Sequence, residues 1–180
     1  MGSAGVGQEN VAAKDKTQPA GRIVSAGCLP GGFFMKVKIA WIGKSKEAAI
    51  QTLTDEYLKR LRRYAEVEGS ALKDESALLK LCAPGARPRH SLALLDGKGK
   101  QFSSEEFASW LADYQHHHAI PLLIGVGPAD GFSDEAREAA TLILSLGKMT
   151  FAHELARVML LEQLYRAFTI LKGHPYHLGH

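Results

Sequence analysis

A short polar stretch near the carboxyl end of the chain carries residue types suited to proton transfer. His174-Pro175-Tyr176-His177 follows a long helical pattern. Such a tail is too polar to add to a core, so we expect it to be either frayed or functional. A histidine, with an ordinary pKa of about 6.5, accepts a proton at neutral pH. Metal binding by His174, His177 and His180 is the alternative, and we expect no metal.

A loop before the same helical pattern is the second candidate for chemistry. It reads Leu146-Gly147-Lys148-Met149-Thr150-Phe151 and follows a strand-like run at 141–146. Ligands of open α/β sheets bind at the carboxyl ends of strands. Two further loops, Leu95-Asp96 and 127–131, also follow predicted strands. We expect the three loops to form one pocket, whose backbone and apolar lining would suit an adenine-bearing cofactor.

The glycines of the second loop do not predict a dinucleotide site. Gly125, Gly127 and Gly131 resemble part of that fingerprint, which also needs an acidic residue about twenty positions further on. The next strand ends at Gly147 and Lys148, with no carboxylate. These glycines therefore indicate only a tight turn or a close backbone approach at a strand end.

Alternating strand and helix patterns must position these loops. Strands are predicted at 35–43, 65–67, 91–95, 120–126 and 141–146, the third being closed by a turn at 96–100. Between them lie helices, one capped by Ser45, one at 73–81, one opened by a capping box at 103–106 and one opened by 133–135. This order predicts an α/β fold, with a mostly parallel sheet and helices on both faces.

The last helix, predicted from Glu154 to Lys172, is apolar on several sides. A helix of this kind is buried on several sides, so we expect a subunit interface as well as a core contact. Its apolar positions include Leu155, Val158, Met159, Tyr165, Phe168 and Ile170.

Composition and charge limit the class of protein. A chain of 180 residues predicts one domain, which we place at 35–180, and it has no apolar run near ~18 residues for a membrane span. Two distant cysteines fit a reducing cytoplasm. Residues 1–34 are rich in Gly, Ala and Ser, so we expect a disordered extension or a start codon placed too early, with a presequence as the weaker alternative. Basic clusters, such as the one at 59–63, would attract phosphates or are simply solvated.

From Met35 to His177 the chain resembles the bacterial ribosomal RNA large subunit methyltransferase H family, within the SPOUT superfamily of knotted methyltransferases. The resemblance covers nearly all of the predicted domain, and its closing motifs are specific. It is carried by MKVKIAWIGKSK at the start, LDGKGK at 95–100, the glycine loop at 127–131, SLGKMTFAHELAR at 145–157, LLEQLYRAFTI at 160–170 and HPYH at 174–177.

The resemblance implies a SPOUT-type sheet with a C-terminal trefoil knot, a homodimer and S-adenosylmethionine as the cofactor. It implies methylation at N3 of a pseudouridine in 23S rRNA of the assembled ribosome. Where the family commonly has two adjacent glycines, this chain has Gly127-Pro128, and proline offers no backbone N–H. The implied cofactor-binding residues are Leu95, Gly127, Leu146, Gly147, Lys148, Met149, Thr150 and Phe151.

The resemblance also implies catalytic roles for the tail. His177 and Tyr176 would help the base lose its proton, and His174 would act there or orient the tail. Arg157 would contact a phosphate or carboxylate, with a structural ion pair to a core glutamate as the equal alternative. Glu162 and Arg166, four positions apart, are expected to form a structural pair.

Two other functions stay open. One is a ribosome-binding factor of the same fold whose activity is weakened, which only Pro128 favours. The other is a SPOUT methyltransferase that acts on another RNA, such as tRNA. Cofactor binding would separate the first from the enzyme, and a comparison of ribosomes with free tRNA would separate the second.

Overall fold

A computed structural model describes residues 1–2, 35–128 and 130–177 of the chain. The expected N-terminal extension therefore lies, apart from its first two residues, outside the described part. Met35 is the first residue described after this gap, and its side chain is buried. None of the helices that the structure describes is both long and apolar enough to cross a membrane.

The centre of the fold is a five-stranded sheet in which every pairing is parallel. β4 lies in the middle and is buried throughout, as expected for a parallel strand covered on both faces. Lysines of β1 pair with glutamates of the edge strand β2, at 3.0 and 2.9 Å. In sheet order the strands are β2 (Glu66–Leu72), β1 (Lys36–Ile42), β4 (Leu122–Val126), β3 (Ser91–Gln101) and β5 (Leu142–Ser145).

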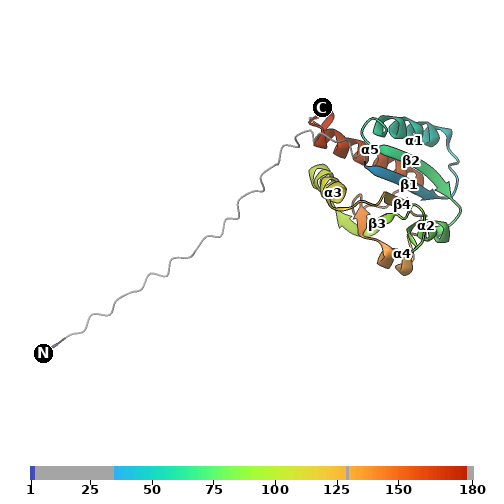
Figure 1. The fold of residues 1–180 in the computed structure, drawn as a ribbon. Coiled ribbons are helices and arrows are strands. Elements are labelled where there is room, and N and C mark those ends of the chain that lie inside the picture. The colour runs from blue at the N-terminus through green and yellow to red at the C-terminus, as the bar shows by residue number, and fades with distance from the viewer. Residues whose placement is uncertain (3–34, 129, 178–180) are drawn as a thin grey trace.

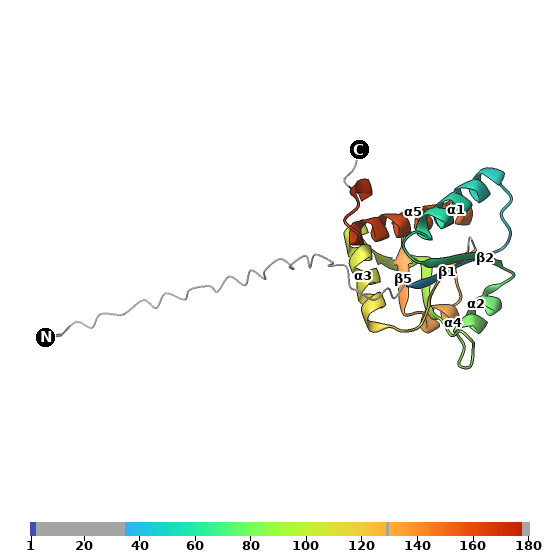
Figure 2. The same ribbon diagram turned by 45° about the horizontal axis from the view of Figure 1, so that its top comes forward.

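Helices cover both faces of the sheet, which confirms the predicted fold class (Figures 1 and 2). The larger core lies between the sheet and the first helix layer, and a smaller core lies on the other face around Leu78, Leu123 and Phe132. The first layer holds α1 (Ala48–Leu61), α3 (Ser104–His117) and α5 (His153–Leu171), and the second holds α2 (Glu75–Cys82) and α4 (Asp134–Ala139).

Helix α5 packs against both α1 and α3, so the expected burial on several sides is confirmed. Leu160, Leu161 and Leu164 have no exposed surface, whereas Leu155 is 50% exposed and Met159 is 38% exposed. The apolar side chains that remain uncovered on α5 therefore lie in its first half. A short 3₁₀ helix, η1 (Pro175–His177), follows α5.

Capping residues explain where the helices begin. The predicted capping box of α3 is confirmed, because Ser103 and Glu106 bond to each other's backbone amides. Asp74 caps α2 through the amide of Ala77. The predicted cap at Ser45 is wrong, since α1 begins at Ala48 without a side-chain cap. Ser45 instead accepts a hydrogen bond from a residue of α5, described below.

The predicted turn at 96–100 is also wrong, because β3 continues through it to Gln101. Leu95 and Lys100 both pair with Leu144 of β5, so the residues between them bulge out of the ladder. A Cβ atom on Gly99 would lie 2.6 Å from backbone atoms of β5. The glycine at this position thus permits a close approach of two strands. From sequence alone, a glycine that serves this purpose looks the same as a glycine in a turn.

Gly99→Ala is therefore expected to lower the free energy of unfolding by about 1–3 kcal/mol, because β5 must shift to make room. Gly97→Ala is the matched control, since a Cβ atom there would have no neighbour within 4 Å. We expect the control to change stability by less than about 0.5 kcal/mol. Urea denaturation measures both values, and equal stability of the two variants would contradict the close approach.

Candidate functional site

A cavity of about 330 Å³ opens at the carboxyl ends of β4 and β5 and beside the bulge that follows Leu95 in β3. Because these three strands are neighbours in the sheet, the bulge and the two loops converge there, and the start of α5 closes the wall. The structure brings together all of the sequence-predicted cofactor residues, which line this cavity: Leu95, Gly127, Leu146, Gly147, Lys148, Met149, Thr150 and Phe151.

The glycine loop after β4 forms one wall, and packing explains its first glycine. A Cβ atom on Gly127 would lie 2.8 Å from the ring of Phe132, which is buried in the smaller core. Gly131 has a φ of +83° and donates a backbone hydrogen bond to Pro128 at 3.0 Å, which closes a turn. The loop thus leaves the sheet and folds back directly beside the cavity.

The loop after β5 forms the opposite wall. The buried Ser145 hydroxyl accepts a bond from the Gly147 amide at 3.2 Å and donates to the Gly147 carbonyl at 3.0 Å. Gly147 has a φ of +144°. Within the described chain, the backbone amides of 148–151 have no acceptor, so they are available to a ligand.

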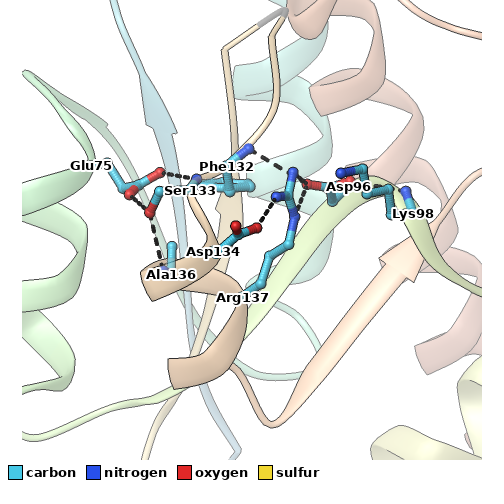
Figure 3. Close-up of polar contacts among 8 residues, drawn as sticks. All are labelled: Glu75, Asp96, Lys98, Phe132, Ser133, Asp134, Ala136 and Arg137. Atoms are coloured by element: carbon cyan, nitrogen blue, oxygen red, sulfur yellow. Dashed lines mark hydrogen bonds and ion pairs between the residues drawn. The ribbon is translucent and has the colours of Figure 1, made fainter.

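Sequence reasoning missed a charged pair in the cavity wall, Asp96 and Arg137. One Asp96 oxygen accepts from Arg137 Nε at 3.1 Å and from Nη2 at 2.9 Å, and the other accepts from the Lys98 amide at 2.9 Å (Figure 3). Burial by itself raises the pKa of Asp96, but the donors outweigh it and hold this pKa below the usual value. Asp96 directly follows Leu95, which was a usable signal, whereas nothing in the sequence singled out Arg137.

The tail packs against α5 as far as Tyr176. The Tyr176 ring meets Tyr165 edge-on at 4.7 Å, and its hydroxyl donates to Glu162 at 3.3 Å. The expectation that the tail adds nothing to a core is therefore wrong for this side chain. Arg166 bonds Glu162 at 2.6 Å and lies over the Tyr176 ring, so the predicted Glu162–Arg166 pair is confirmed.

Burial raises the pKa of Tyr176 to about 12, and the nearby Tyr57 and Glu162 add to the effect. The phenol is therefore protonated at neutral pH and acts as a hydrogen-bond donor, not as a base. His174 is exposed, and its Nδ1 accepts from the Tyr176 amide at 3.2 Å. The backbone of His177 belongs to η1, and its side chain lies outside the described part of the structure.

The structure does not bring the tail to the cavity of the same subunit. His153 and Ala156, in the first turn of α5, line the cavity, whereas the tail follows the last turn (Figure 2). The 19 residues of α5 correspond to about 28 Å at 1.5 Å per residue. The two predicted parts of the site therefore lie at opposite ends of one helix.

Arg157 does not line the cavity, because its side chain is buried with 1% exposure. Its Nη2 donates to the Ser45 hydroxyl at 2.7 Å, and its guanidinium lies 4.4 Å from the centre of the Trp41 ring. In the described part of the chain it forms no ion pair with a carboxylate, so the expected structural pair with a core glutamate is not present. Arg157 instead ties the loop after β1 to α5, so we treat it as a positioning residue.

Comparison with known proteins gives matches over the same part of the chain that forms the fold. A family described as "Predicted SPOUT methyltransferase" matches residues 35–177. The protein named ribosomal RNA large subunit methyltransferase H from Koribacter versatilis is 54% identical over 146 residues, covering 81% of this chain and 100% of that protein. The protein of the same name from Gloeobacter violaceus is 43% identical over 158 residues, again covering 81% and 100%.

A solved structure supports the fold. It is "a probable methylase family protein from Haemophilus influenzae Rd KW20", with a TM-score of 0.51 and 8% identity, covering 79% of this chain and 70% of that chain. The family match spans the sheet, the cavity and the tail. The chain therefore belongs to the SPOUT methyltransferases, in the ribosomal RNA large subunit methyltransferase H family.

Proposed function

We propose that this methyltransferase uses S-adenosylmethionine to methylate N3 of a pseudouridine in 23S rRNA of the assembled ribosome. The observation that carries the proposal is the cavity at which the β3 bulge and the loops after β4 and β5 converge. The names of the full-length relatives support rRNA of the large subunit as the substrate. The trefoil knot stays a prediction from the family, and the cytoplasmic location stays a prediction from the two distant cysteines.

The residues present fit the proposed cofactor. The cavity of about 330 Å³ falls within the range of about 300–1,000 Å³ for small-molecule sites. Leu95 and Phe151 supply apolar wall, and the amides of 148–151 supply hydrogen-bond donors for a nucleoside. When bound, the cofactor supplies a methyl group that its sulfonium already activates.

The protein has to place the base and remove the proton from N3. We assign the acceptance of this proton to His177, because histidine is basic at neutral pH. Tyr176 stays protonated, and its hydroxyl, which donates to Glu162, holds the tail against α5. His174, which accepts a bond from the tail backbone, holds the 3₁₀ helix in shape.

We further propose a homodimer in which the tail of one subunit serves the cavity of the other. The length of α5 separates the tail from its own cavity. Leu155 and Met159 are exposed apolar residues near the cavity end of α5, and Met149 in the cavity loop is 76% exposed. A two-fold contact over these side chains would remove them from water and bring a partner beside the cavity.

A basic cluster at the end of α1 supports RNA as the substrate. Lys59, Arg62 and Arg63 are exposed there. The guanidinium of Arg60 lies 5.9 Å from the centre of the Tyr165 ring, which contacts Tyr176 of the tail. The cluster therefore lies beside the tail, where it would attract the phosphates that flank the target base.

Mass mapping of 23S rRNA tests this function. Ribosomes from a strain without the protein are expected to lack one methyl group on one pseudouridine, and purified protein with the cofactor is expected to restore it. Free tRNA serves as the comparison substrate. Methylation of tRNA and not of ribosomes would favour a SPOUT methyltransferase that acts on another RNA.

A ribosome-binding factor without activity is the second candidate, and the position of Pro128 favours it. Pro128 lines the cavity and offers no amide. Calorimetry separates the two, because an enzyme must bind S-adenosylmethionine. Ribosome binding without cofactor binding would establish the second candidate.

A further inference from the structure

We propose that Asp96 and Arg137 form a positioning pair that holds the end of the glycine loop, Gly131 and Phe132, in the shape that binds the cofactor. The expected effect on S-adenosylmethionine affinity rests on the proposed function, whereas the expected effect on the loop does not. Neither residue is among the cofactor-binding residues that the sequence predicted, yet both line the cavity.

The pair joins three segments of the cavity wall. Asp96 lies at the bulge of β3, Arg137 comes from α4, and the Phe132 amide at the end of the glycine loop donates to Asp96 at 3.5 Å (Figure 3). A Cβ atom on Gly131 would lie 3.2 Å from Arg137 Nη2 and 3.4 Å from an Asp96 oxygen. The turn at Gly131 is thus packed directly against the two charged groups.

A second contact holds the same end of the loop from the opposite side. Glu75, at the start of α2, accepts from the Ser133 amide at 3.0 Å and from the Ser133 hydroxyl. Ser133 also caps α4 through the Ala136 amide. The end of the glycine loop is therefore anchored twice, at the Phe132 amide and at Ser133.

Burial makes the pair more than a surface contact. The side chain of Asp96 is 5% exposed and that of Arg137 is 17% exposed. Removing Arg137 leaves the buried Asp96 carboxylate with backbone donors alone, and removing Asp96 leaves Arg137 with only the exposed Asp134, so either change is unfavourable. Both Asp96 oxygens already accept hydrogen bonds, and Arg137 also contacts Asp134 at 3.0 Å. The pair is therefore built to hold the wall and not to transfer protons.

The test compares Asp96→Asn and Arg137→Gln with a matched control, Lys38→Gln. Lys38 pairs with Glu68 at 2.9 Å on the far strands of the sheet, and its side chain is 19% exposed. Hydrogen exchange of the amides at 131–133 is measured in the protein without ligand. We expect about tenfold faster exchange in both pair variants, because the buried partner loses its hydrogen bonds, and no change in the control.

Calorimetry with S-adenosylmethionine is the second measurement. Each pair variant is expected to bind about tenfold more weakly, and the double variant no more weakly than the worse single one, because the two act as one unit. Arg137→Lys keeps the charge but loses the two-pronged contact, so it is expected to fall between wild type and Arg137→Gln. It also serves as the test if Asp96→Asn does not fold.

Exchange at 131–133 that matches the Lys38→Gln control would overturn the inference, whatever the affinity of the wild type. Faster exchange with unchanged cofactor affinity would overturn the link between the loop and binding. A wild type that does not bind S-adenosylmethionine contradicts the proposed function instead, and the exchange data still decide whether the pair shapes the loop.

Discussion

Gly147→Val is expected to abolish S-adenosylmethionine binding, with an affinity loss of at least about 100-fold, while the fold remains intact. Gly147 has a φ of +144°, a conformation that a β-branched residue avoids. A Cβ atom there would meet nothing within 4 Å, so the substitution changes the loop backbone without a clash in the core. Calorimetry measures the binding, and thermal unfolding measures the fold.

Gly85→Val is the matched control for this prediction. Gly85 also has a positive φ, +93°, and open space around it, but it lies outside the cavity wall. We expect it to bind the cofactor as the wild type does. Undiminished binding by Gly147→Val would move the cofactor site away from the loop at 146–151, and equal losses in both variants would point to general destabilisation.

A mixture of two inactive variants is expected to regain activity if the site is shared between subunits. One variant carries Gly147→Val and the other lacks residues 174–180. A heterodimer then has one intact cavity facing one intact tail, so it should recover up to about half of the wild-type activity. The reason is the length of α5, which places a subunit's tail far from its own cavity. Methyl transfer to ribosomes is the readout.

Subunit exchange must be demonstrated in the same mixture, for example by native mass spectrometry of mass-labelled chains. Each variant mixed with itself is the control and should stay at background. Background activity in a mixture with proven heterodimers would contradict the shared site. The family assignment would stand in that case, because it rests on the sequence and the fold.

Local pattern was enough to predict the sheet, the two helix layers and the three segments that meet at the cavity. The alternation of strands and helices implies parallel strands, and the carboxyl ends of parallel strands meet at one edge. The segment at Leu95-Asp96 and the loops after β4 and β5 could therefore be assigned to one pocket from their place in the chain. The specific closing motifs identified the family for the same reason: they are contiguous in sequence.

Tertiary structure alone decided the features that depend on distant partners. Asp96 meets Arg137 across 41 positions, and Arg157 meets Ser45 across 112. Gly99 belongs to a run whose composition is typical of a turn, but it lies against the backbone of β5. Such pairings follow from the order of strands in the sheet, which helical and strand periodicity do not contain. Turn propensity likewise reports that a glycine is conformationally free, and only the packed neighbour reveals whether that freedom serves a bend or a close approach.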